Sequence, residues 1–160
     1  MDIGIVSNAG NFKFRVSGIV QQDGKTLVMQ INNNEFYCMP GGHVEIGELA
    51  EEAIEREMKE ELTFPVKIKK LICIHENIFF RKDGKPFNEI AFYYLAEPTE
   101  NVDKSDKTFI ENDKGELKTL FTSWKTDEEL KKLHFKPEMV KKVILENNTD
   151  FKLITSRDKK

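Results

Sequence analysis

The chain has 160 residues, of which 39% are hydrophobic and 33% are charged, and a formal net charge of −3. These values predict one soluble globular domain over residues 1–160 and lack the net positive charge that is typical of proteins that bind duplex nucleic acid. No apolar run approaches the roughly 20 residues of a membrane span, the first residues do not show the pattern expected of a signal peptide, and Cys38 and Cys73 are expected to be free core thiols. We therefore expect a cytoplasmic monomer or homodimer without a membrane partner or a stable nucleic acid partner.

Turn residues divide the first part of the chain into short strands. The expected strands cover residues 12–21, 26–31 and 36–39. The Asp23-Gly24 pair is typical of a hairpin turn between the first two, and Pro40 ends the third. Gly41 and Gly42 then permit a tight turn before a helix begins.

The second part of the chain returns to strands and ends with helices. The expected strands cover residues 66–80, 89–97, 116–124 and 151–156, and the expected helices cover residues 127–133 and 137–146. Asp83-Gly84 marks a turn, and Pro137 suits the first position of a helix. The polar residues 98–112 are expected to form a surface loop.

Residues 40–64 concentrate acidic side chains. Eight of the 28 acidic residues lie here against two bases, so this segment is at −6, while the rest, with 20 acids and 23 bases, is at +3. The acidic residues are Glu45, Glu48, Glu51, Glu52, Glu55, Glu57, Glu60 and Glu61. Residues 48–62 contain good helix formers and neither Gly nor Pro in their interior, which predicts a helix.

Helical spacing places three of these carboxylates unusually. At about 100° per residue, the packing face holds Leu49, Ala50, Ala53, Ile54, Met58 and Leu62. Glu57 and Glu61 fall inside this face and Glu60 lies on its flank, which is costly unless a cation meets them. Their i, i+3 and i, i+4 spacing lets them converge, and Mg²⁺ prefers such oxygen donors. The sequence therefore indicates a metal site, and the alternative is a merely solvated acidic helix.

The same residues carry a resemblance to a known family. The segment resembles the Nudix box, in which a glycine, a glutamate, an Arg-Glu pair, a Glu-Glu pair and a second glycine stand at fixed spacings. The matching positions within residues 42–64 are Gly42, Glu48, Arg56, Glu57, Glu60 and Glu61. Thr63 stands where the box has its second glycine, and this departure questions the turn geometry at the helix exit.

The resemblance implies a fold, a reaction and a metal. Nudix proteins are α/β proteins, built as an α/β/α sandwich with a mixed β-sheet and a loop-helix-loop catalytic motif. They use Mg²⁺ or Mn²⁺ to hydrolyse a nucleoside diphosphate linked to another moiety, by attack of water at phosphorus. In this chain the resemblance assigns Glu57, Glu60 and Glu61 as metal ligands, with the backbone of Gly41 or Gly42 completing the metal shell or turning the loop over it.

The resemblance also assigns supporting roles. Arg56 would position a ligand carboxylate, because it can pair with Glu60 or with Glu52. Glu48 would orient Arg56 or assist through a metal-bound water. The general base remains open between Glu60, Glu61 and a carboxylate outside the box.

Outside the box, two carboxylates and several aromatic residues are candidates. Glu76 and Glu89 lie in a stretch that resembles MutT-like members, where a histidine often stands at the position of Asn88. Glu89 is a candidate ligand, base or substrate contact, and Gly42 and Phe80 are candidate substrate contacts. The aromatic residues Phe79, Phe80, Phe92, Tyr93 and Trp124 either stack on a nucleobase or belong to the core. His43, His75 and His134 are expected at the surface or in loops rather than as ligands.

The substrate is inferred mainly from the absence of the sequence signatures that mark Nudix subgroups. Phe79 replaces the proline of ADP-ribose members, and Phe80 replaces the tyrosine of diadenosine-polyphosphate members. Neither the NADH-type nor the coenzyme A-type signature is present. We expect the substrate to be a nucleoside triphosphate, in ordinary or oxidised form, which is cleaved to a monophosphate and pyrophosphate. The alternative is a non-catalytic Nudix-fold module that binds nucleotides or regulates.

Overall fold

The structure is a computed structural model that describes residues 1–113 and 115–159. The described strands are β1 (Gly4–Val6), β2 (Asn11–Gln22), β3 (Lys25–Ile31), β4 (Gly41–His43), β5 (Val66–Phe80), β6 (Pro86–Pro98), β7 (Lys107–Asp113), β8 (Glu116–Thr126) and β9 (Lys152–Arg157). The described helices are α1 (Ala50–Glu61), α2 (Asp127–Lys132) and α3 (Glu138–Leu145). None of the helices in this part of the chain has the length and apolar character needed to cross a membrane.

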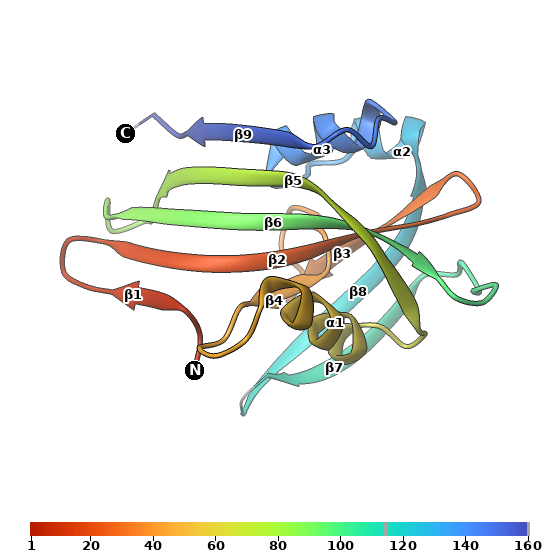
Figure 1. Cartoon of the computed structure of the whole chain (residues 1–160), viewed down its shortest axis with the longest axis horizontal. Helices are drawn as coiled ribbons and strands as arrows, with labels where there is room; N and C mark the ends of the chain where they lie inside the picture. The colour runs from red at the N-terminus through yellow and green to blue at the C-terminus, as the bar shows by residue number, and fades with distance from the viewer. Residues whose placement is uncertain (114, 160) are drawn as a thin grey trace.

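The strands form one mixed sheet in the order β7-β8-β3-β2-β6-β5-β9, and β1 and β4 also pair with β2. The β2–β6 and β5–β9 pairs are parallel, and the other pairs are antiparallel. Figure 1 shows the long strands β2, β6 and β5 side by side, with α2 and α3 together at one end and α1 apart from them.

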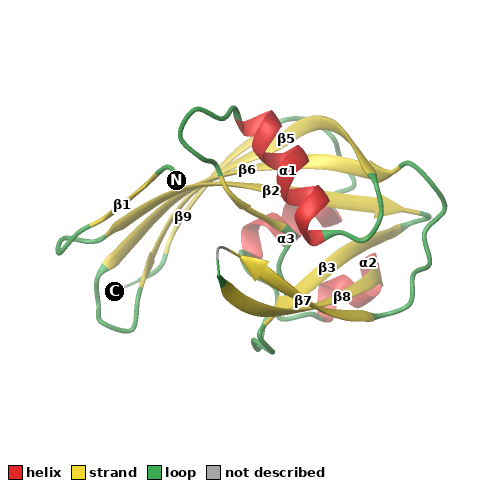
Figure 2. Ribbon diagram, turned by 90° about the horizontal axis from the view of Figure 1, so that it is seen from below, coloured by secondary structure: helices red, strands yellow, loops and turns green. Residues whose placement is uncertain are grey.

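The sheet divides where β2 meets β3. These strands pair only near their turn, through Gln21–Thr26 and Gln22–Lys25, whereas β3 pairs with β8 over its whole length. The strands β3, β8 and β7 therefore diverge from β2, β6 and β5, and Figure 2 shows the two groups separating. This separation leaves room for a cleft beside α1.

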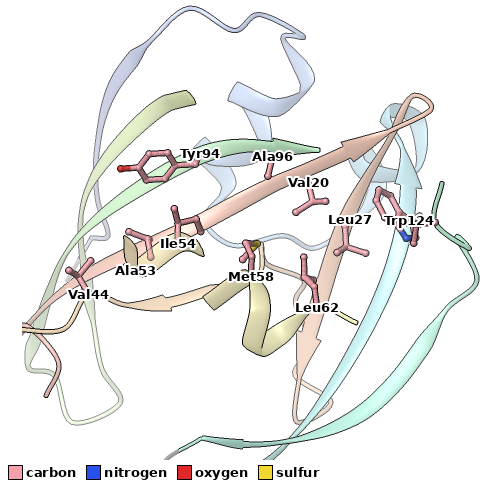
Figure 3. Packing of buried hydrophobic residues seen from close by; sticks show 12 residues of the cluster. Val20, Leu27, Val44, Ala53, Ile54, Met58, Leu62, Tyr94, Ala96 and Trp124 are labelled. Atoms are coloured by element: carbon pink, nitrogen blue, oxygen red, sulfur yellow. The ribbon is translucent and has the colours of Figure 1, made fainter. Parts of the chain in front are cut away.

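Two hydrophobic cores lie on opposite faces of the sheet. On β2, Val16 and Val20 belong to the core under α1, while Ile19 belongs to the core under α2 and α3. This alternation is the period of two that a strand imposes on its side chains. Figure 3 shows Ile54 and Met58 of α1 pointing toward the sheet residues of the first core. Helices on both faces of a mixed sheet make the predicted α/β/α sandwich, and that prediction is confirmed.

Several boundaries differ from the sequence expectations. Strand β7 occupies much of the region expected to be a surface loop, and β4 replaces the tight turn expected at Gly41 and Gly42. The expected strand at 36–39 is reduced to isolated bridges at Tyr37 and Cys38. Leu49, expected on the packing face, is the N-cap residue of α1 and is 71% exposed. Strand β4 escaped prediction because it is only Gly-Gly-His, and β7 because its short run of β-branched and aromatic residues, Thr108 to Ile110, lies among charged and polar ones.

Candidate active site

Helix α1 presents its acidic residues in two different environments. Glu57 and Glu61 are buried, with exposed fractions of 8% and 5%, beside the apolar residues that pack on the sheet. The Glu60 side chain remains 51% exposed. The helical spacing predicted this division, so two of the three candidate ligands stand where an unpaired carboxylate is costly.

Glu61 is fixed by the backbone of β4. Its Oε2 atom accepts a hydrogen bond of 2.6 Å from the amide of Gly41. Burial raises the pKa of Glu61 well above its ordinary value, and the hydrogen bond from Gly41 opposes that rise. Nearby Glu57 and Glu111 raise the pKa further, because their negative charges disfavour another one.

Glu57 lies against Gly42 and is held by Arg56. A Cβ atom on Gly42 would lie 2.2 Å from Glu57 Oε1, so only glycine leaves room for this carboxylate. Arg56 Nη1 donates to Glu57 Oε1 at 2.7 Å. Burial raises the pKa of Glu57, and the hydrogen bond and charge of Arg56 act in the opposite direction. The loop glycine and the helix thus meet at this carboxylate.

Arg56 is the centre of the hydrogen-bond network. Its Nε and Nη2 atoms donate to the two carboxylate oxygens of Glu48 at 2.9 Å each, and Nη2 also donates to the carbonyl of His43 at 3.0 Å. Nη1 reaches Glu60 at 3.2 Å in addition to Glu57. The hydrogen bond from Arg56 is the main reason that the pKa of Glu48 is lowered, and the pKa of Arg56 is raised chiefly by Glu48.

The structure therefore brings the box residues together around one guanidinium. The expected pairing of Arg56 with Glu60 is present, whereas Glu52 instead accepts from the backbone of Leu49 at the helix start. Glu48 orients Arg56, as the resemblance implied, and it also accepts from the Glu45 amide at 3.0 Å. The bidentate geometry makes Arg56 a rigid clamp between the loop and the helix.

Thr63 does not disturb the exit of the helix. Leu62, the C-cap residue, already has an extended backbone with φ −109° and ψ 142°, and Thr63 is not among the described residues with positive φ. A glycine is required at a helix exit only where the backbone enters the left-handed region. The chain leaves α1 directly toward β5, so a threonine fits.

A cleft of about 770 Å³ lies beside these residues, where β3, β8 and β7 separate from β2. Its lining includes the carboxylates of Glu57, Glu60 and Glu61, the cationic side chains of Lys13, Arg15 and Lys118, and the aliphatic side chains of Ile31, Ile110 and Leu120. Gly41 and Gly42 also line the cleft. The lining also includes Asp2, Glu45, Glu111 and Glu116, so carboxylates and cations are mixed around an opening of the size that small-molecule sites have.

The donor set suits a hard divalent cation. Within residues 1–113 and 115–159, no three His, Cys, Asp or Glu side chains converge as closely as the ligands of a formed metal site. The reason is that Arg56 draws Glu57 and Glu60 toward itself, while Gly41 holds Glu61. The three carboxylates nevertheless line one cleft, offer only oxygen, and include two that are buried. Mg²⁺ and Mn²⁺ fit that chemistry.

The candidates outside the box lie elsewhere. Phe80 lies at the β5–β6 turn, paired with Pro86, and does not line the cleft, because its strand has left the site by that point. Glu76 is exposed on β5. Glu89 is buried on β6, and its carboxylate lies 3.8 Å from Arg15 Nη1. Glu89 is thus behind the cleft wall rather than on its surface.

No aromatic wall lines the cleft in the part of the chain that the structure describes. Tyr93 and Trp124 are core residues, Phe92 packs edge-to-face on Phe14, and Phe79 stacks on Phe87. The core alternative therefore holds for Phe92, Tyr93 and Trp124, whereas Phe79 belongs to neither core. The aliphatic residues noted above take the place of a stacking wall.

The histidines and cysteines follow the expectations in part. His75 is fully buried on β5, so its expected surface position was wrong, whereas His134 is exposed. His43 lines the cleft, with Nδ1 lying 3.3 Å from Asp2. Cys38 and Cys73 are free thiols, as predicted, although Cys38 is only half-buried.

Sequence reasoning missed Arg15 and Glu111. Arg15 projects from β2 into the cleft, and Glu111 lies on β7 close enough to raise the pKa of Glu61. The available signal for Arg15 was a charged residue inside a run of apolar and aromatic strand residues. Glu111 carried no local signal, because its strand was read as a loop and its approach to α1 depends on tertiary structure.

Comparison with known families and structures agrees with this geometry. The NUDIX domain profile matches residues 12–144, well over half of the chain. The chain belongs to the NUDIX family. The family predicted from the box is therefore confirmed, and a hydrolase acting on phosphoric anhydride bonds is supported.

Individual relatives of this Nudix protein vary in closeness. An ADP-ribose pyrophosphatase from Methanocaldococcus jannaschii is 42% identical over 65 residues, which span 39% of this chain and 38% of that protein. A NUDIX hydrolase from Nitrosomonas europaea matches with a TM-score of 0.64 and 16% identity over 91% of this chain and 79% of its own. A MutT protein from Bacillus halodurans matches with a TM-score of 0.62 and 22% identity, over 91% and 89%. At such identities the two structures support the fold.

Proposed function

We propose that this chain is a Mg²⁺- or Mn²⁺-dependent Nudix hydrolase that cleaves a phosphoric anhydride bond in a nucleoside diphosphate linked to another moiety. The observation that carries the proposal is the complete clamp of Arg56 on Glu48, Glu57 and Glu60 at the edge of the cleft. We take residues 1–160 as one catalytic domain in this proposal.

The residues divide the chemical work among themselves. Glu57, Glu60 and Glu61 would hold the cation, which neutralises phosphate charge and acidifies a bound water. Arg56 keeps Glu57 in place, and the Gly41 amide keeps Glu61 in place. Gly41 lies close enough for its backbone to take part in the same shell.

Proton transfer assigns Glu60 a second role. As a water oxygen bonds to phosphorus and the bridging P–O bond breaks, the water loses a proton and the leaving phosphate takes up charge. Glu60 is half exposed and lines the cleft, whereas Glu61 is buried and accepts a hydrogen bond from Gly41. Glu60 is therefore the better placed general base of the two.

Two substrate classes follow from separate observations. The missing proline at Phe79 favours a nucleoside triphosphate, in ordinary or oxidised form, which would give a monophosphate and pyrophosphate. The similarity to the Methanocaldococcus jannaschii ADP-ribose pyrophosphatase favours ADP-ribose, which would give AMP and ribose 5-phosphate. A panel of triphosphates, oxidised triphosphates and sugar nucleotides, with chromatographic analysis of both products, decides between them.

The reaction is tested by Glu57→Gln and Glu61→Gln. We expect both variants to lose turnover of every compound that the wild-type protein hydrolyses with Mg²⁺, because each removes a charged cation ligand. Glu55→Gln is the matched control, since Glu55 is an exposed residue of the same helix and its charge change is identical. Turnover retained in both ligand variants would contradict the hydrolase proposal.

A binding module is the second candidate. It predicts nucleotide binding by calorimetry and no product with either Mg²⁺ or Mn²⁺. A solvated acidic helix without a cation predicts instead that Mg²⁺ leaves the melting temperature unchanged, because only a ligand that binds the native state raises it. The Arg56 clamp favours the enzyme over both, since neither alternative requires carboxylates at these buried positions.

A further inference from the structure

Arg15 is a cation of the cleft that the box does not include. It projects from β2 into the cleft, close enough to Glu57 and Glu61 of α1 for its charge to act on both, and its side chain is 33% exposed. Its Nε atom is buried and has no hydrogen-bond partner among the described residues. A buried donor without a partner is costly, so its presence calls for an explanation.

The remaining contacts of Arg15 are long. Nη2 donates to the carbonyl of Gly41 at 3.4 Å, near the upper limit for a hydrogen bond, and Nη1 lies 3.8 Å from Glu89 Oε2. A guanidinium has five N–H donors and prefers two parallel bonds to one anion at about 2.7–2.9 Å. The protein thus holds Arg15 in place while leaving part of its hydrogen-bonding capacity unused.

A purely structural role does not account for this arrangement. If Arg15 served only to neutralise Glu89, the buried pair would close to hydrogen-bond distance, because a pair removed from water depends on short contacts. By comparison, Arg56 meets Glu48 at 2.9 Å through two bonds. The carboxylate of Glu89 instead lies behind Arg15 and keeps its charge facing the cleft.

Gly41 connects Arg15 to the candidate metal ligands. The amide of Gly41 donates to Glu61, and its carbonyl accepts from Arg15, so one residue separates the carboxylate from the guanidinium. An anion that reaches Arg15 therefore lies beside the phosphate that Glu57, Glu60 and Glu61 would address through a cation.

We propose that the guanidinium of Arg15 binds non-bridging oxygens of a phosphate group of the substrate. The inference rests on the proposed function and adds that, of two adjacent phosphate groups, one would lie at the cation and the other at Arg15. A guanidinium fork matches phosphate geometry, which a lysine ammonium does not.

Binding of pyrophosphate in the presence of Mg²⁺ tests Arg15 independently of turnover. We expect Arg15→Gln and Arg15→Lys to weaken binding measured by calorimetry by about 10-fold to 100-fold, the value of a charged hydrogen bond. Arg81→Gln is the control, because Arg81 is an exposed residue of the β5–β6 turn and the same charge is lost. Equal affinities in wild type and Arg15→Gln, or an equal loss in Arg81→Gln, would overturn the proposal.

A second variant guards against misfolding. Arg15→Gln leaves the buried Glu89 carboxylate without a cation, so Arg15→Gln/Glu89→Gln replaces both charges and leaves two amides that can pair. We expect this double variant to fold, as judged by circular dichroism, and to show the same loss of pyrophosphate affinity. Pyrophosphate bound by the folded double variant as tightly as by wild type would refute the role of Arg15.

Rescue of activity by free guanidinium distinguishes a phosphate-binding role of Arg15 from a purely structural one. With a compound that the wild-type protein hydrolyses, Arg15→Ala is expected to lose about 10²-fold to 10³-fold in kcat/KM, in the range of a lost transition-state donor. Low millimolar guanidinium should restore part of that loss in Arg15→Ala and none in Arg56→Ala, whose network it cannot rebuild. No rescue, together with unchanged pyrophosphate affinity, would count against the proposal. If the wild-type protein hydrolyses nothing, the hydrolase proposal fails while the binding experiment still decides on Arg15.

Discussion

Replacing Gly42 by alanine tests whether the loop glycine positions the Glu57 carboxylate. The added Cβ would lie 2.2 Å from Glu57 Oε1 and 2.3 Å from Cδ and Oε2. Ordinary contacts between such atoms begin at about 3.5 Å, so the carboxylate must move by about 1 Å. No positive φ is involved at Gly42, so the effect is steric rather than a backbone strain.

The magnitude follows from what Glu57 does. Its Oε1 atom is held at 2.7 Å by Arg56, so a displaced carboxylate either breaks that bond or pulls the guanidinium from Glu48. A misplacement of about 1 Å in catalytic geometry costs about 10²-fold in rate. We therefore expect Gly42→Ala to lower kcat/KM about 100-fold and to raise the Mg²⁺ concentration needed for half-maximal activity.

The assay compares rate and stability in the same variants. Gly84→Ala is the control, because Gly84 has a positive φ of 76° and no atom near its added Cβ, and it lies in the β5–β6 turn. That variant should lower the melting temperature, since the left-handed region costs an L-residue about 1–2 kcal/mol, without lowering activity. Wild-type activity and wild-type Mg²⁺ dependence in Gly42→Ala would refute the steric reasoning.

Three further predictions concern residues on and beyond the clamp. Arg56→Lys should lower kcat about 10-fold to 100-fold, because an ammonium cannot reproduce the two parallel hydrogen bonds to Glu48. In a double-mutant cycle, the Arg56→Lys/Glu48→Gln variant should lose little more kcat than either single variant. Thr63→Gly should not raise activity and should lower stability by about 0.5–1 kcal/mol in urea unfolding, because Thr63 has no positive φ that glycine would relieve. His75 is buried, with a lowered pKa caused by burial, and its Nε2 lies 2.7 Å from Ser156 Oγ. A lowered folded pKa means that the unfolded chain binds the proton more readily, so the contribution of His75 to stability is present above about pH 6.5 and is lost as the pH falls toward the folded value. His75→Gln should therefore show a smaller drop in melting temperature than wild type between about pH 7.5 and about pH 5.5, and an equal drop would contradict this account.

The helix and its acidic face were predictable because their signal is local. Spacing alone placed Glu57 and Glu61 on the packing side of α1, and both are buried. The long strands β5 and β2 were predicted within one residue at each end, because their β-branched and aromatic content is high and turn residues bound them. Local patterns therefore predicted these long elements, whereas the strand expected at residues 36–39 is reduced to isolated bridges.

The other wall of the cleft was not predictable from local patterns. Strand β7 lies at the edge of the sheet, and its run of β-branched and aromatic residues is only three long, within a charged and polar segment. Its position opposite α1 depends on the divergence of β3 from β2, which in turn depends on pairing with β8. Glu111 and Lys118 meet the box residues only through that arrangement, whereas Arg15 is brought to the box loop by the pairing of β2 with β4. The sequence therefore predicted the catalytic motif and not the surface that faces it.

The same divergence explains why the candidate site is incomplete without a ligand. Folding alone brings Glu57 and Glu61 out of water, with Arg56 bonded to Glu57, while a second guanidinium, Arg15, lies near both carboxylates with a buried donor unmatched. A cation between the carboxylates and a phosphate chain reaching Arg15 would satisfy both sides together, since each supplies the charge that the other lacks. If so, Mg²⁺ and pyrophosphate should bind cooperatively. Calorimetry should then show that Mg²⁺ tightens pyrophosphate binding more in wild type than in Arg15→Gln, after correction for formation of the Mg²⁺–pyrophosphate complex in solution. An equal enhancement in both proteins would show that Arg15 and the cation act independently.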